Sequence, residues 1–76
     1  MTGDDRAYLR EVGMRVRVAR VRRRISQDQL AEIAAVSRVS LGSIERGEHA
    51  AGLITYRKIA GALGVAMGDL LDAERS

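Results

Sequence analysis

The side chains best able to do chemistry in this sequence are its arginines, which crowd the N-terminal third. Residues 1–24 hold eight arginines against Asp4, Asp5 and Glu11, a net charge of +5. Residues 25–76 hold five basic and seven acidic side chains, a net charge of −2. Guanidinium groups gathered on a folded domain favour polyanions and acidic surfaces. The charge pattern therefore predicts a polyanion or an acidic partner.

Residue types for other chemistry are scarce. The chain has no cysteine, and its one histidine, His49, has no carboxylate or nucleophile at a spacing that would make a catalytic pair. A nucleotide-binding loop directly follows a strand, and no strand is predicted before the glycine-rich stretches of this chain. We therefore expect no enzymatic activity, no metal site and no cofactor.

No segment has the pattern of an export signal or a membrane span. The N-terminus carries Asp4, Asp5 and Arg6 where a signal peptide has a basic and then an apolar region. The longest apolar stretch, residues 59–67, is too short to cross a bilayer. We expect a cytoplasmic protein with no membrane partner.

The elements that position the arginines are all predicted to be helices, packed in one domain over residues 1–76. Leu9, Val12, Val16 and Ala19 form the apolar face of a first helix at about residues 5–23. Ser26 and Gln29 form a capping-box pattern, so a second helix begins at Gln27. Further helices are expected after Gly52, ended by Gly64, and around residues 67–71. Residues 1–7 and 73–76 are expected to fray.

The stretch from Ser26 to Gly47 has two interpretations, because apolar spacing alone does not decide between them. A single long helix leaves Val36 outside the apolar face and Ser37 within it. With a turn at residues 35–36, Val36 enters the core, and Ser37 caps a new helix with its hydroxyl. The second interpretation, two helices joined by a turn, buries more of the apolar residues.

Two longer stretches bear on the fold and the function. They are SQDQLAEIAAVSRVSLGSIERGE, residues 26–48, and ITYRKIAGALGVAMGDLL, residues 54–71. They resemble the central and last helices of phage-repressor-like regulators, the Cro/cI or XRE family, and the similarity runs from about Val12 to Leu71. The resemblance implies an all-α, five-helix domain with a helix-turn-helix at about residues 27–46. Its second helix, residues 37–46, would read the major groove of double-stranded DNA.

The resemblance also implies roles for single residues. The base-reading positions of the family match Arg38, Val39 and Ser43. The positions that face the DNA backbone match Gln27, Ser37, Ser40 and Arg46. A structural ion pair of the family matches Arg20 and Glu45. Three residues depart from the family pattern: Ala35 and Arg24 stand where glycine is usual, and Ala66 where a capping serine or threonine is usual. A positive φ at either of the first two would cost about 1 kcal/mol.

The function implied is sequence-specific DNA binding by a dimeric transcriptional regulator, associated with the nucleoid when bound. The alternative is a protein-interaction module, antitoxin-like or regulatory, that keeps the fold and binds a protein partner. Two surfaces compete as the homodimer contact: the outer face of the first helix (Met14, Val18, Val21) and the last helix (Met67, Leu70, Leu71). Four arginines form a stripe on the first helix: Arg6, Arg10, Arg17 and Arg24. The stripe either adds phosphate contacts at its C-terminal end or only keeps the helix solvated. Solvation is favoured for Arg6 and Arg10.

Overall fold

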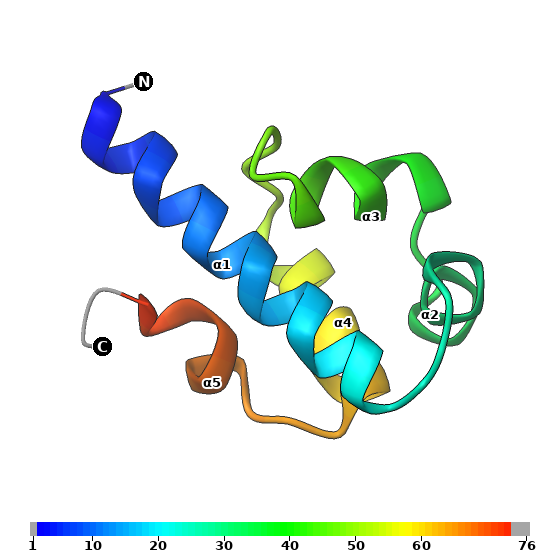
Figure 1. The fold of residues 1–76 in the computed structure, drawn as a ribbon. Helices are drawn as coiled ribbons and strands as arrows, with labels where there is room; N and C mark the ends of the chain where they lie inside the picture. The colour runs from blue at the N-terminus through cyan, green and yellow to red at the C-terminus, as the bar shows by residue number, and fades with distance from the viewer. Residues whose placement is uncertain (1, 74–76) are drawn as a thin grey trace.

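Five α-helices account for most of the chain in a computed structural model, which describes residues 2–73 (Figure 1). They are α1 (Gly3–Arg22), α2 (Gln27–Ala34), α3 (Arg38–Glu45), α4 (Leu53–Leu63) and α5 (Met67–Leu71). The described residues contain no strand. The prediction of an all-α, five-helix domain with a helix-turn-helix is confirmed.

The first helix begins earlier than the sequence analysis expected. Thr2 caps it: the Asp5 amide donates to the Thr2 hydroxyl, and the Asp5 carboxylate accepts from the Thr2 amide. This reciprocal capping explains why residues 3–7, expected to fray, are helical. The Tyr8 hydroxyl also donates to the Leu71 carbonyl and ties this end of α1 to the end of α5. Ala73 is buried, and residues 74–76 lie outside the described part of the chain.

Every helix contributes to one apolar core. In Figure 1, α1 crosses the whole molecule, with α3 on one side, α5 on the other and α4 behind it. The eight largest side chains with almost no exposure come from all five helices: Val12, Val16, Leu30, Leu41, Ile44, Ile59, Leu63 and Leu70. Full burial of a side chain of this size stabilises the fold by about 1.5–3 kcal/mol. The core therefore holds α3 firmly by its inner face.

The stretch left open by the sequence is two helices joined by a turn. Ala35 ends α2 with a left-handed φ of 57°. Ser37 then caps α3 by accepting a hydrogen bond from the Ser40 amide. Val36 packs half-buried against the core. These features confirm the two-helix interpretation, and the two helices meet at the turn without a glycine.

Both family glycine positions at the ends of helices carry strained backbone. Arg24, after α1, has φ 58°, and Ala35 has φ 57°; among the non-glycine residues of the described chain only these two have a positive φ. Each left-handed non-glycine residue costs about 1–2 kcal/mol. At the third departure, Ala66, the Asp69 carboxylate accepts from the Ala66 amide and supplies half of a capping box. The fold therefore tolerates all three departures.

Glycine is required where α1 crosses α3. A Cβ atom on Gly13 would lie 2.2 Å from the Ile44 carbonyl oxygen, well inside contact distance. The backbone of α1 thus touches the backbone at the end of α3, which fixes how α3 is presented.

Over residues 2–73, no helix has the length and apolar character that crossing a membrane demands.

Candidate nucleic-acid interface

The outer face of α3 is polar and accessible, while its inner face is locked into the core. Leu41 and Ile44 are buried, whereas Arg38 and Val39 are exposed and Ser43 is half-buried. Val39 is 74% exposed, so its methyl groups are open to a ligand. The structure therefore brings the three residues expected to read bases onto one accessible side of α3. Their contacts with bases remain a prediction.

Arg38 is paired with an acidic residue that the sequence analysis did not single out. Its Nε donates to Asp28 Oδ1 at 3.1 Å, across the turn from α2. Both side chains are open to water, 56% and 81% exposed. Within residues 2–73 the two terminal nitrogens of Arg38 make no hydrogen bond, so both are available as donors. Asp28 lies in the first turn of α2, and no sequence spacing signals its contact with a residue of α3.

Arg46, expected at the DNA backbone, is held in a similar way at the other end of α3. Its Nε donates to Glu48 Oε1 at 3.0 Å and its Nη2 to Ser43 Oγ at 3.4 Å. A Cβ atom added to Gly42 would lie 3.2 Å from Arg46 Nη1 and 3.7 Å from Arg38 Nη1. The two guanidinium groups therefore converge over a glycine that leaves them room. Such a pair of cations favours an anionic ligand.

The Arg20–Glu45 pair is the centre of a buried polar network. Arg20 Nε and Nη2 donate to the two Glu45 oxygens at 2.8 and 3.1 Å, and Arg20 Nη1 donates to the Ile25 carbonyl at 2.9 Å. Gln27 Nε2 donates to Glu45 Oε1 at 3.1 Å. The network joins α1, α2 and α3. Gln27, expected to contact a phosphate, thus uses part of its amide inside the protein, while the N-terminal amides of its helix still favour an anion.

The two serines expected at the DNA backbone differ in their surroundings. Ser37 is exposed, and its Oγ accepts from the Ser40 amide as the cap of α3. Ser40 is half-buried one turn later. Because a hydroxyl that accepts can still donate, Ser37 keeps a hydrogen for an external acceptor. His49 is exposed in the loop after α3, and residues 2–73 include no cluster of three side chains able to hold a metal ion.

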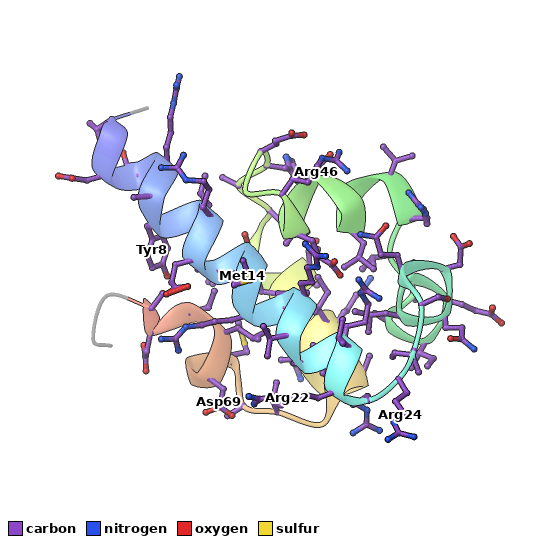
Figure 2. All side chains as sticks on the ribbon, viewed as in Figure 1. Tyr8, Met14, Arg22, Arg24, Arg46 and Asp69 are labelled. Atoms are coloured by element: carbon purple, nitrogen blue, oxygen red, sulfur yellow. The ribbon has the colours of Figure 1, made fainter. Side chains whose placement is uncertain are left out.

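The arginines of α1 divide between structural and exposed positions. Arg15 Nη1 donates to the Asp69 carbonyl of α5, and Arg23, which directly follows α1, donates through Nη1 to the Leu63 carbonyl at the end of α4. Figure 2 shows Arg22 and Arg24 at the edge of the molecule opposite Arg46. The C-terminal end of the basic stripe therefore lies away from α3, which does not favour the phosphate contacts considered for it.

Comparisons with known proteins agree with this geometry. A family model described as helix-turn-helix matches residues 16–70. An immunity repressor protein of Bacillus phage phi105 is 40% identical over 63 residues, which are 83% of this chain and 44% of that protein. The chain thus spans less than half the length of this relative. The crystal structure of the restriction-modification controller protein C.AhdI from Aeromonas hydrophila superposes with a TM-score of 0.82. It is 33% identical, and the match covers 84% of this chain and 97% of that one.

The family match includes the elements that present the polar face of α3. Residues 16–70 contain the C-terminal third of α1, all of α2, α3 and α4, and all but the last residue of α5. The buried Arg20–Glu45 pair and the strained turn at Ala35 both lie inside this segment. From the matched segment and the fold together, the chain belongs to the helix-turn-helix family, in its phage-repressor-like XRE branch of DNA-binding regulators.

Proposed function

We propose that the protein binds double-stranded DNA in a sequence-specific way and regulates transcription, with α3 lying in the major groove. The observation that carries the proposal is the exposed N-terminal face of α3, where Arg38 presents two free donor nitrogens while Leu41 and Ile44 hold the helix rigidly from behind. A helix held in this way can dock in the groove as a fixed template. The similarity to an immunity repressor and to a restriction-modification controller supports a regulatory role.

Each side chain of the face suits a different contact. Arg38 can donate two hydrogen bonds to O6 and N7 of a guanine, an interaction that contributes about 1–3 kcal/mol of discrimination. Val39 offers a methyl surface that fits the methyl group of thymine. Ser43 is short and half-buried, so we assign it a water-mediated contact. The expected backbone residues would hold the helix in register through phosphates: Gln27, Ser37, Ser40 and Arg46.

We further propose that the protein acts as a homodimer, because one such helix reads only a few base pairs. Of the two surfaces considered, α5 alone is unsuitable, since Leu70 is buried in its own core. A groove of about 350 Å³ between α1 and α5 combines the two. Met14 and Val18 expose apolar surface there, and Arg22 and Asp69 flank it with opposite charges. Because the patch carries both charges, Arg22 of one protomer can face Asp69 of the other across a two-fold axis.

The dimer contact is tested by charge insertion. Met14→Glu and Val18→Glu, on exposed sites of the groove, should convert a dimer to a monomer in sedimentation experiments while the protein stays folded. Leu53→Glu, a matched exposed apolar site on α4 that lies outside the groove, should leave the dimer intact. Equal behaviour of all three variants would exclude the groove as the dimer contact.

The function itself is tested by selecting binding sites from random duplex DNA at near-physiological salt. We expect a two-fold symmetric motif with half-sites about 34–36 Å apart, one helical turn. Folded protein that recovers no motif would overturn the proposal. It would favour the alternative function, a module that binds a protein partner through the same face. A protein with a nucleoid DNA target would act in the cytoplasm, as the sequence analysis expected.

A further inference from the structure

A basic surface lies beside the C-terminal end of α3, next to the converging guanidinium groups of Arg38 and Arg46. It includes residues outside the matched family segment. Arg6 and Arg10, one turn apart on α1, line a hollow of about 410 Å³ together with Arg46, Gly47 and Glu48. The family match begins at residue 16, so Arg6 and Arg10 lie outside the segment that it covers. From the sequence alone, these two arginines were expected only to keep the helix solvated.

Backbone contacts hold the two sides of this hollow together. Gly47 has a φ of 73°, and a Cβ atom there would lie 2.7 Å from Arg10 Cα. The loop after α3 therefore rests directly on α1. Its own position is set by hydrogen bonds from the Gly47 amide to the Ile44 carbonyl and from the Glu48 amide to the Ser43 carbonyl, at 3.0 and 2.9 Å. Arg10 is thus placed relative to α3 by backbone, while the Tyr8–Leu71 hydrogen bond holds the same end of α1.

The hollow is positively charged. Its lining contains three arginines and one carboxylate, Glu48, which accepts from Arg46 Nε. Arg6 and Arg10 are exposed, and neither guanidinium pairs with an acidic group within residues 2–73. A surplus of two positive charges in a concave surface attracts an anion.

The position of the hollow along α3 identifies the anion. Arg46 lines the hollow and also donates to Ser43 Oγ, and its Nη1 lies 3.2 Å from the position of a Cβ on Gly42, beside Arg38 Nη1 at 3.7 Å from the same point. The hollow therefore adjoins the face of α3 that is proposed to meet base edges. When that face occupies the major groove, the anion beside it is a phosphate of the sugar-phosphate backbone.

We propose that Arg6 and Arg10, together with Arg46, bind a phosphate of the DNA backbone beside the base pairs that α3 reads. The proposal rests on the proposed function, because the phosphate reaches the hollow only when α3 occupies the groove. Contacts to phosphate add affinity without sequence information. The N-terminal turns of α1 are thus an affinity element that leaves the recognised sequence unchanged.

The test compares salt dependence in matched variants. The probes are the duplex recovered by selection and a scrambled duplex of the same length, titrated by fluorescence anisotropy between about 50 and about 200 mM salt. The Arg6→Gln/Arg10→Gln variant should lower the slope of log K against log salt by about 1 for each arginine removed from each bound protomer. The dissociation constant near 0.1 M salt should rise about five- to tenfold per arginine. The ratio of the two affinities should stay unchanged.

Arg24→Gln is the matched control, because it removes the same charge just after the end of α1, at the edge of the molecule opposite Arg46 (Figure 2). It should leave the slope unchanged. Arg6→Lys/Arg10→Lys should also keep the slope, since phosphate accepts a point charge as well as a planar one. Each slope comes from titrations of a single protein at several salt concentrations, so a smaller folded fraction does not imitate the effect.

Three results would overturn the inference while leaving the proposed function in place. They are an unchanged slope in the double glutamine variant, an equal loss in Arg24→Gln, and a changed affinity ratio, which would mean contact with bases. A wild-type protein that binds neither duplex at low salt would overturn the proposed function and this inference together.

Discussion

Two arginine–carboxylate pairs of this protein have the same chemistry in opposite surroundings. The side chains of Arg20 and Glu45 are 14% and 3% exposed, and two hydrogen bonds join them, at 2.8 and 3.1 Å. Those of Arg38 and Asp28 are 56% and 81% exposed, and one hydrogen bond of 3.1 Å joins them. The first pair links α1 to α3 inside the protein. The second links α2 to α3 on the surface proposed to meet DNA.

The difference shows how burial assigns a role to an ion pair. A buried carboxylate has lost its hydration, so removal of its partner leaves an uncompensated charge. Glu45 therefore requires Arg20 and Gln27, and the pair is structural. An exposed pair contributes little to stability, because water solvates each partner when they separate. Arg38 is thus free to exchange or share its carboxylate when a base approaches.

The largest effect should come from breaking the buried pair. We expect Glu45→Ala to lower the free energy of unfolding by about 3–5 kcal/mol, since it leaves the Arg20 charge buried without its partner. Urea denaturation measures the change. The double variant Arg20→Met/Glu45→Leu removes both charges and should recover much of the loss. A Glu45→Ala protein as stable as wild type would show that the two pairs are equivalent.

Removal of Arg38 from the exposed pair should affect DNA binding more than stability. Arg38→Ala should weaken binding to the selected duplex by about 1–3 kcal/mol and relax the preference at one base pair, because a bidentate guanine contact is lost. Its unfolding free energy should change by no more than about 1 kcal/mol, because the exposed pair with Asp28 contributes little to stability. Titration of duplexes substituted at each position locates the base pair. A uniform loss on every sequence would make Arg38 a phosphate contact.

The turn between Asp28 and Arg38 can be relaxed without removing either pair. Ala35→Gly should raise the free energy of unfolding by about 1 kcal/mol, because glycine adopts the left-handed conformation without the steric cost that alanine has. Thermal unfolding with a matched Arg24→Gly variant tests this, since the two residues have nearly the same positive φ. The preference for DNA sequence should not change in either variant. A lower melting temperature would show that the strain is compensated in wild type.

The smallest effect should be the coupling of Arg38 and Asp28 in the free protein. A double-mutant cycle with Arg38→Ala and Asp28→Asn should give about 0.2–1 kcal/mol of stability, the range of exposed pairs. Asp28→Asn should nevertheless reduce base discrimination, because the guanidinium loses the contact that orients it. Glu32→Gln, which removes an exposed charge one turn later on the same helix, is the control and should leave discrimination intact. A loss of equal size in the control would point to a general charge effect.

Local signals explain most of what could be predicted from the sequence. The capping box of Ser26 and Gln29 placed the start of α2, and the left-handed Gly64 placed the end of α4. Both depend on hydrogen bonds between residues a few positions apart, so the residue types are sufficient evidence. The start of α1 was missed although Thr2 and Asp5 carry the same local signal. The base-reading and backbone roles come from the family resemblance and remain predictions.

The sequence by itself determined the helical class, the apolar positions of the core and most of the helix ends, because these follow from periodicity and short-range capping. Only the tertiary structure decided that Asp28 holds Arg38, that Gly13 touches Ile44, and that Arg10 lies beneath Gly47. Each of these contacts joins two different elements, ten or more residues apart. Their geometry depends on the angle at which whole helices cross, which is set by the packing of the entire core and not by any one segment.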